Sequence, residues 1–123
     1  MAAASAHTLS KAERLSGRNA VSALLSQGRY GVAGCLKYCY RKDNGLEFSR
    51  ILISVPKRSF KRAVKRNLLK RRIRESYRLQ KELFGSGKDI LFIYTPKEVL
   101  PFADIHAAMG EIGRGFAAAE DRE

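Results

Sequence analysis

The chain has 123 residues, of which 45% are hydrophobic, and these values predict one globular domain with a modest core and exclude a wholly disordered chain. Its 24 Lys and Arg outnumber its 12 Asp and Glu, and the net charge of +12 indicates a polyanionic partner, either nucleic acid or an anionic membrane surface. No apolar run approaches the roughly 18 residues that a spanning helix needs, so the membrane alternative is limited to surface binding.

The first predicted element is a short amphipathic helix that follows Leu15. Residues 1–13 are Ala-rich and lack a charged segment followed by a long apolar one, so they predict a disordered tail and exclude a secretory signal. Apolar residues at helical spacing indicate the helix: Ala20, Val21, Leu24 and Leu25. Gly28 fits its C-terminal end.

Two strands joined by a tight turn are predicted next. In residues 35–41 the alternation places Tyr38 and Tyr40 on one face of a strand. Residues 48–55, rich in Ile and Val, form the returning strand. Residues 43–45 (Asp-Asn-Gly) favour a hairpin turn between them, because Asn-Gly tolerates the positive φ angles that such turns need.

The sequence is dominated by a basic segment from Lys57 to Lys81, which holds twelve Lys and Arg and one acid, Glu75. Half of the positive charge therefore lies in about a fifth of the chain. Residues 63–83 fit a helix in which an arc of roughly 140° is polar. The side chains on this arc are Arg66, Asn67, Lys70, Arg71, Arg74, Arg78 and Lys81.

The opposite side of this helix is apolar, although Lys65 and Arg72 interrupt it. Its apolar members are Val64, Leu68, Leu69, Ile73, Leu79 and Leu83. Tyr77 lies close to the apolar edge and is predicted to pack in the core. Because one acid cannot neutralise so many cations by pairing along the helix, a polyanion is expected on the polar side. The alternative is a basic helix that is simply well solvated.

The last third of the chain predicts one more strand and a final helix. Residues 89–95 form a nearly continuous apolar run, which is typical of a central strand buried on both faces. Pro101 can begin the last helix. Its apolar residues recur at spacings of three and four, which indicates core packing: Phe102, Ile105, Met109, Ile112 and Phe116.

The order of these elements is helix, two or three strands, helix, strand, helix. It predicts a single-domain α+β sandwich in which three helices pack against a small mixed sheet. The domain is expected to span residues 14–118, with a C-terminal tail at residues 119–123.

No catalytic or metal site is indicated by the residues themselves. Cys35 and Cys39 would lie about 13 Å apart on a strand, too far for a disulfide, and are predicted to be free thiols in a reducing cytoplasm. The two histidines, His7 and His106, form no catalytic or ligand set, and Asp89 stands alone as a carboxylate for Mg²⁺. The sequence thus predicts no catalytic residue, no metal and no cofactor bound by the protein.

The basic segment resembles the signature of the bacterial ribonuclease P protein subunit in three runs: residues 54–58 (Ser-Val-Pro-Lys-Arg), 62–67 (Arg-Ala-Val-Lys-Arg-Asn) and 70–75 (Lys-Arg-Arg-Ile-Arg-Glu). The positions that match the family pattern are Arg66, Asn67, Lys70, Arg71, Arg74 and Glu75. Leu68 stands where the family usually has a third cation. The resemblance covers roughly Arg14 to Phe116.

This resemblance implies a small basic protein that binds a large catalytic RNA and, with it, removes the 5′ leader of precursor tRNA by endonucleolytic cleavage. The RNA does the chemistry and requires Mg²⁺, so the chain would be a subunit of the enzyme without a catalytic residue. One protein per RNA, a cytoplasmic location and no membrane partner are expected. The implied fold is that of the second domain of ribosomal protein S5, with a left-handed β-α-β crossover that the residue pattern alone does not predict.

The basic helix and the segment before it are the predicted RNA-binding surface, through charged hydrogen bonds to phosphates. Its residues are Lys57, Arg58, Lys61, Arg62, Arg66, Asn67, Lys70, Arg71, Arg74 and Arg78. Asn67 can address a base edge or a ribose 2′-hydroxyl, or it is a surface amide without a function. With about six phosphates engaged, affinity falls about a thousandfold between 50 and 200 mM salt.

A second surface is implied by the family, in which a cleft between the first helix and the sheet holds the single-stranded leader. The positions that would line it are Arg14, Arg18, Val21, Leu25, Tyr38 and Tyr40. Val21 and Leu25 stand where the family commonly has aromatic residues, so this helix offers no ring for stacking. Tyr38 and Tyr40 can stack on unpaired bases, or they are half-buried strand aromatics.

Two other functions remain as alternatives. A ribosomal or other structural RNA-binding protein of the same fold would bind ribosomal RNA in cells. A self-sufficient protein nuclease would cut precursor tRNA after all RNA had been removed from it.

Overall fold

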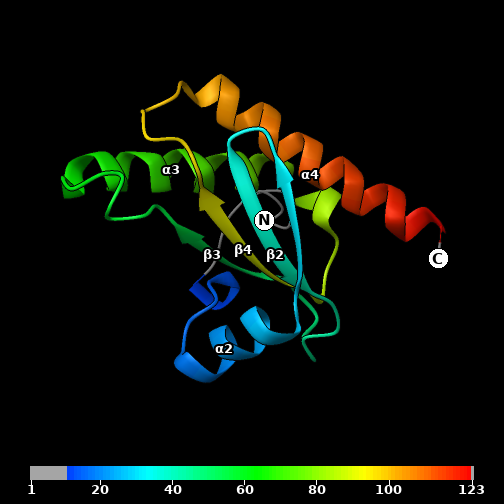
Figure 1. The fold of residues 1–123 in the computed structure, drawn as a ribbon. Coiled ribbons are helices and arrows are strands. Elements are labelled where there is room, and N and C mark those ends of the chain that lie inside the picture. Colours follow the sequence, from blue (N-terminus) through cyan, green and yellow to red (C-terminus); the bar gives the residue numbers. More distant parts are fainter. Residues whose placement is uncertain (1–10, 123) are drawn as a thin grey trace.

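The computed structural model describes residues 11–122 and shows a four-stranded sheet with one helix on one face and two on the other (Figure 1). The strands are β1 (Arg29–Ala33), β2 (Leu36–Arg41), β3 (Arg50–Ser54) and β4 (Asp89–Tyr94). The helices are α2 (Arg18–Gln27), α3 (Ala63–Gln80) and α4 (Phe102–Arg122), with 3-10 turns η1 (Lys11–Glu13) and η2 (Lys81–Phe84). The predicted α+β sandwich with three helices and a mixed sheet is confirmed.

The sheet order corrects one prediction. The strands lie in the order β1-β2-β4-β3, and every neighbouring pair is antiparallel except β3 and β4, which are parallel. The hairpin predicted between residues 35–41 and 48–55 is therefore wrong, because β4 lies between β2 and β3. The hairpin partner of β2 is β1, which the sequence reading did not identify.

The turn at residues 43–45 explains that error. Asp43 and Gly45 do take positive φ angles, of 58° and 80°, as the Asp-Asn-Gly signal predicts. A turn signal reports only the local bend of the chain, however, and does not identify the strand that pairs next. β4 is more apolar than β3 and takes the place beside β2, so the β3–α3–β4 connection is the β-α-β crossover of this fold.

The two faces of the sheet carry separate apolar clusters. The larger one lies between the sheet and the pair α3 and α4, and includes the predicted stripe of the last helix at Ile105, Met109, Ile112 and Phe116. The smaller one lies under α2 and consists of Leu15, Leu24, Cys39 and Leu91. None of the described helices combines the length and apolar character that a bilayer crossing requires.

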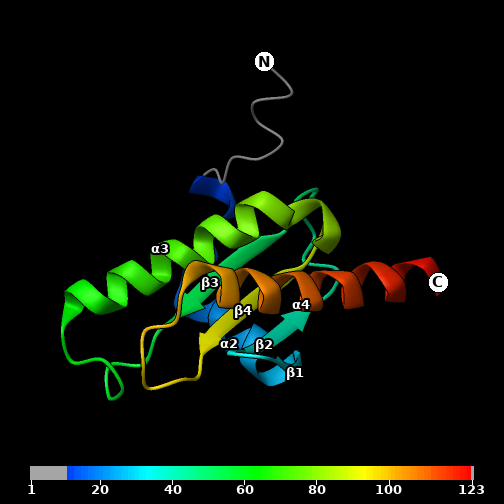
Figure 2. The same ribbon diagram turned by 90° about the horizontal axis from the view of Figure 1, so that it is seen from above.

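The apolar side of α3 is narrower than the sequence predicts. Leu69, Ile73 and Tyr77 are buried, so the placement of Tyr77 in the core is confirmed. Val64 is 78% exposed, because the first turn of α3 extends beyond the strands (Figure 2), and Leu79 is 41% exposed. For these two residues the predicted packing against the core is wrong.

Ordered elements extend into both predicted tails, and the bounds of the domain stay a prediction. The tail at residues 1–13 falls mostly outside the described residues, but Lys11–Glu13 forms η1, and the Leu15 amide donates a hydrogen bond to the Ile51 carbonyl at 2.7 Å. At the other end, α4 continues to Arg122 and does not stop at residue 118. Three consecutive alanines at 117–119 favour this continuation, because Ala has the highest helix propensity.

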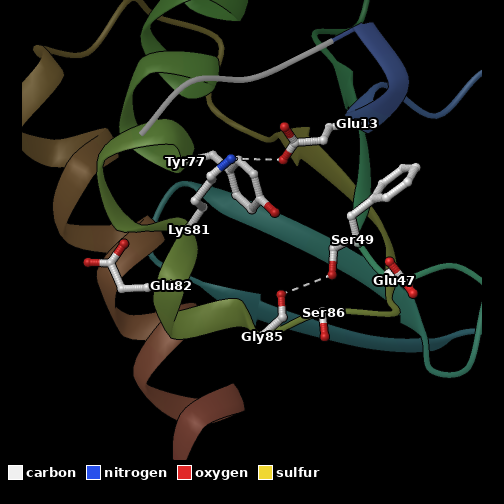
Figure 3. Close-up of a pocket in the computed structure, with 9 residues that line it drawn as sticks. Glu13, Glu47, Ser49, Tyr77, Lys81, Glu82, Gly85 and Ser86 are labelled. Carbon is white, nitrogen blue, oxygen red and sulfur yellow. Dashed lines mark hydrogen bonds and ion pairs between the residues drawn. The ribbon is translucent and has the colours of Figure 1, made fainter. Parts of the chain in front are cut away.

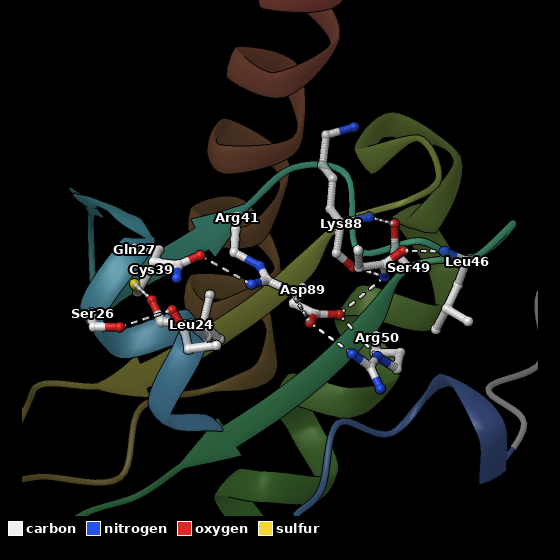
Figure 4. A network of polar contacts seen from close by, with 12 residues as sticks. Leu24, Ser26, Gln27, Cys39, Arg41, Leu46, Ser49, Arg50, Lys88 and Asp89 are labelled. Atoms are coloured by element: carbon white, nitrogen blue, oxygen red, sulfur yellow. Dashed lines mark hydrogen bonds and ion pairs between the residues drawn. The ribbon is translucent and has the colours of Figure 1, made fainter. Parts of the chain in front are cut away.

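Asp89 joins three strands at one end of the sheet (Figure 4). It is fully buried, and the register places Arg41 of β2 and Arg50 of β3 directly beside it. Arg50 donates two hydrogen bonds to the carboxylate, at 2.9 and 2.8 Å, and the Arg41 guanidinium lies 3.9 Å away. The Asn44 amide adds a third donor at 3.0 Å, so the 43–45 turn is held against β4.

We predict that Asp89→Ala lowers the free energy of unfolding by about 3 kcal/mol, because it leaves two largely buried guanidinium groups without a counter-charge. Urea denaturation measures the effect. The matched control Glu111→Ala removes an exposed carboxylate from α4 and should change stability by less than about 0.5 kcal/mol. Equal stability of the two variants would show that the Asp89 cluster does not hold the sheet together.

Candidate nucleic-acid interface

The solvent side of α3 carries the predicted cations. Asn67 and Arg71 are exposed, and Arg66, Lys70 and Arg74 are half-exposed on the side away from the core. In the part of the chain that the structure describes, none of the four cations in this set forms an ion pair with a carboxylate. Within the described residues, the positive charge of Arg66, Lys70, Arg71 and Arg74 is therefore not neutralised by carboxylates.

Arg14 joins this surface from the N-terminal segment. Its backbone forms a parallel β-bridge with Ile51 of β3, which brings its side chain to a pocket of about 290 Å³. Lys70 and Arg74 of α3 line the same pocket, and no acidic residue does. The family resemblance predicts that Arg14 lines the cleft beside the first helix, whereas the structure places it next to the α3 cations.

The electrostatics of this pocket favour an anion. Partial burial lowers the pKa of Arg74, and the nearby positive charges of Arg14 and Arg71 lower it further. Like charges that are held together and partly removed from water destabilise one another, and a bound phosphate would remove that cost. The charge of this pocket, between the N-terminal segment and α3, is therefore the charge expected of an anion site.

Two of the predicted RNA-binding residues have partners within the protein. Arg66 donates hydrogen bonds to the carbonyls of Phe60 and Lys61, at 2.6 and 2.9 Å, and so holds the loop that precedes α3. Arg78 forms an ion pair with Glu75 one turn earlier on the same helix. Arg66 thus positions the surface as well as charging it, and the charge of Arg78 is balanced within the helix.

The loop before α3 adds four exposed cations to the same surface: Lys57, Arg58, Lys61 and Arg62. A tight turn shapes this loop, with the amides of Ser59 and Phe60 both donating to the Pro56 carbonyl at 3.2 Å. Phe60 is buried and anchors the turn to the core. These cations therefore lie on an ordered loop at the beginning of α3.

The predicted leader cleft is only partly assembled. Tyr38 and Tyr40 face away from α2: their rings pack against Phe116 of α4, with centroids 5.9 and 4.5 Å apart. Side chains alternate along a strand, so it is Cys39 that faces α2, where its thiol lies 3.4 Å from the Leu24 carbonyl. The prediction that Tyr38 and Tyr40 line this cleft is wrong, and their alternative reading as half-buried strand aromatics is confirmed.

Other residues line the sheet beside α2. Tyr30 of β1 pairs with Cys39 in register, is 54% exposed and donates a hydrogen bond to the Leu25 carbonyl at 3.1 Å. The Lys37 ammonium lies 5.6 Å from the centre of the Tyr30 ring. The sequence contained a signal for this face of β2. Cysteine is commonly buried, so Cys39 could be expected to turn toward α2, and the alternation of a strand then places Lys37 on the same face.

The helix residues of this cleft differ in exposure. Val21 is half-buried and packs against the cluster under α2, whereas Leu25 is 44% exposed and Arg18 is exposed. Leu25, Tyr30 and Lys37 thus lie together and present an apolar, an aromatic and a cationic side chain.

A third hollow, at the C-terminal end of α3, has the opposite character (Figure 3). It has a volume of about 390 Å³ and is lined by Glu13, Glu47 and Glu82, with Lys81 paired to Glu13 at 3.0 Å. The Tyr77 hydroxyl points toward it, and burial raises the pKa of this phenol. The charged residues that line this hollow are three acids and one base, so the hollow disfavours phosphates and the basic surface does not extend to the C-terminal end of α3.

Within the described residues, no group of three or more His, Cys, Asp or Glu could hold a metal ion. Cys35 and Cys39 are free thiols, as predicted. Both are buried in the structure, and burial raises the pKa of each thiol. His106 lies between α3 and α4, where its Nδ1 is 2.8 Å from the Ser76 hydroxyl and 3.1 Å from the Gln80 amide. Its role there is to join the two helices.

The sequence matches the model of the family Ribonuclease P over residues 9–115. A relative from Porphyromonas gingivalis with the name Ribonuclease P protein component is 36% identical over 110 residues, which cover 82% of this chain and 80% of the relative. A relative of the same name from Chlorobaculum tepidum is 38% identical over 93 residues, covering 67% of this chain and 60% of the relative.

Solved structures of the same kind of protein share the fold. The RNase P protein from Thermotoga maritima aligns with a TM-score of 0.73 and 28% identity, covering 84% of this chain and 96% of that one. The RNase P protein from Staphylococcus aureus aligns with a TM-score of 0.74 and 24% identity, covering 86% and 99%. The second likeness shows the fold alone.

The structural role of Arg66, which holds the loop before α3, can be tested against its neighbour Asn67, which is exposed and makes no such contact. Arg66→Gln should lower the free energy of unfolding by about 1 kcal/mol, because two charged hydrogen bonds to backbone carbonyls are lost. Asn67→Ala, at an exposed helical position, should leave stability unchanged or raise it slightly. Urea denaturation of both variants provides the test, and an unchanged Arg66→Gln midpoint would rule out its structural role.

Proposed function

The chain belongs to the ribonuclease P protein family, and from this premise we propose that it binds the catalytic RNA of ribonuclease P through α3. The observation that carries the proposal is the set of cations on α3 that no carboxylate of the described chain neutralises. RNA phosphates supply the missing negative charge. Asn67, exposed beside these cations, supplies an amide that can address a base edge or a 2′-hydroxyl.

The pocket of Arg14, Lys70 and Arg74 is the proposed anchor of this interface. Two guanidinium groups and one ammonium converge there from separate elements, so a single phosphate can accept hydrogen bonds from several directions. Partial burial lowers the pKa of Arg74, the positive charges of Arg14 and Arg71 lower it further, and a bound phosphate would offset both effects. Part of the binding energy therefore comes from relieving an unfavourable electrostatic arrangement in the free protein.

In this proposal the RNA subunit carries the catalytic chemistry, with Mg²⁺ ions that the RNA holds. The protein positions the substrate and reduces the repulsion between two polyanions, the RNA subunit and precursor tRNA. We further propose one protein per RNA subunit and a cytoplasmic location. The cleavage removes the 5′ leader and leaves the mature 5′ end of the tRNA.

We propose that the leader lies beside α2 and contacts a different set of residues from the one predicted from the sequence. Leu25, Tyr30 and Lys37 replace Tyr38 and Tyr40 as the candidate contacts, because only the former group is exposed on that face of the sheet. An exposed tyrosine offers a ring to an unpaired base, and Lys37 offers a charge to the adjacent phosphate. Arg18 extends the positive charge along α2.

Lys70→Ala combined with Arg74→Ala should weaken binding of the RNA subunit about 20-fold near 0.15 M salt. The slope of log affinity against log salt should fall by about 1.6. Both values are those expected for two lost phosphate contacts. Filter binding at several salt concentrations, with leader cleavage measured in parallel, provides the readout.

The matched control combines Arg29→Ala with Arg114→Ala, which removes the same charge from exposed positions outside this surface. Equal losses in the two double variants would show that only net charge matters.

The two alternative functions make different predictions. If ribosomal RNA, and not the ribonuclease P RNA, is recovered with the protein from cells, the ribosomal alternative is favoured. Cleavage of precursor tRNA by RNA-free protein would favour the nuclease.

Leader recognition can be tested separately. Lys37→Ala should weaken binding of precursor tRNA to the assembled enzyme about fivefold near 0.15 M salt, the value of one lost phosphate contact, and leave binding of leaderless tRNA unchanged. Tyr38→Phe, on the other face of β2, serves as the control and should affect neither. An equal loss for both tRNAs would place Lys37 outside the leader site.

A further inference from the structure

A second basic pocket lies on the other flank of α3, at the start of the helix. It has a volume of about 430 Å³ and is lined by residues of the loop before α3, the first turn of α3 and the loop between β4 and α4. The course of the two loops can be followed in Figure 2. Its lining includes four cations: Lys61, Arg62, Lys65 and Lys97. Lys65 is one of the two residues that interrupt the apolar side of the helix, and Lys97 is far away in the sequence.

These four cations are unpaired although an acid is close by. Glu98 lines the same pocket, yet in the described part of the chain no ion pair joins it to any of the four. All four side chains are exposed, so they keep their hydration at little cost and can exchange it for an anionic partner.

The loop that carries Lys97 is held in place from both ends. The buried Tyr94 hydroxyl donates to the Glu98 carbonyl at 2.7 Å and accepts from the Leu100 amide at 3.0 Å. Arg72 of α3 donates to the Leu100 carbonyl at 2.6 Å, which explains the second interruption of the apolar side. A binding surface that is already ordered loses less conformational entropy when a partner arrives.

The loop before α3, which forms the other wall of the pocket, is anchored to Tyr94 as well. The ring of Phe60 packs on that of Tyr94 with centroids 5.8 Å apart, and Arg66 hydrogen-bonds the carbonyls of Phe60 and Lys61. Both walls of the pocket therefore share one buried anchor, and their cations keep a fixed spacing.

We propose that this pocket is a second contact with the backbone phosphates of the RNA subunit, in which Lys65 and Lys97 act as binding residues. The proposal rests on the proposed function and extends it. Lys61 and Arg62 belong both to this pocket and to the surface in front of α3, so the positive surface continues around the beginning of the helix. The same RNA can follow it from one flank to the other, and the loop cations read backbone charge without sequence preference.

The test compares Lys65→Ala combined with Lys97→Ala against the control Arg29→Ala combined with Arg114→Ala, each removing two exposed charges. Thermal unfolding first establishes that both fold like the unmodified protein. Binding to the ribonuclease P RNA of the same organism is then measured over a series of salt concentrations, and binding of precursor tRNA to the assembled enzyme forms a second arm.

The expected result is a loss of affinity for the RNA subunit of about 20-fold near 0.15 M salt, and a salt slope lower by about 1.6, beyond those of the control. Equality with the control, or a loss confined to precursor tRNA, would overturn the inference. Failure of the unmodified protein to bind the RNA subunit would instead overturn the proposed function. If Lys70→Ala with Arg74→Ala weakens binding while the Lys65 and Lys97 variant matches its control, only the second contact is rejected.

Discussion

The parallel pairing of β3 with β4 is the constraint on which the rest of the structure depends. Parallel neighbours need a connection that crosses the sheet, and here that connection is the basic helix α3. Because α3 must cover the sheet between these two strands, Leu69, Ile73 and Tyr77 are fixed in the core and the opposite side is left to solvent. The row formed by the buried Asp89 and the partly buried Arg41 and Arg50 holds the three strands in the register that makes this possible.

Charge is distributed unequally along α3. Its C-terminal end meets Glu13 and Glu82, and its middle and N-terminal parts meet cations from three other segments, represented by Arg14, Lys61 and Lys97. In the free protein, partial burial lowers the pKa of Arg74, and the charges of Arg14 and Arg71 lower it further. Net charge alone does not produce this pattern, since it depends on which loops the fold brings beside the helix.

Some of the charged side chains of α3 stabilise the loops around the interface through hydrogen bonds within the protein. Arg66 holds the loop in front of α3, and Arg72 holds the loop that carries Lys97. Both remain charged while they do so, because backbone carbonyls accept their hydrogen bonds without neutralising them. Order and positive potential are thus supplied by the same residues.

The sequence by itself determined the three helices, the strands β2, β3 and β4, and the polarity of α3. Helical periodicity, an unbalanced run of cations and a strongly apolar strand are local properties. It also identified the family, through the residues from Ser54 to Glu75. Only the tertiary structure decided that β4 separates β2 from β3, that Cys39 faces α2 while Tyr38 and Tyr40 face α4, and that Arg14 and Lys97 lie beside the basic helix. Strand partners and neighbours across a pocket are chosen by burial over the whole chain, and no local pattern records that choice.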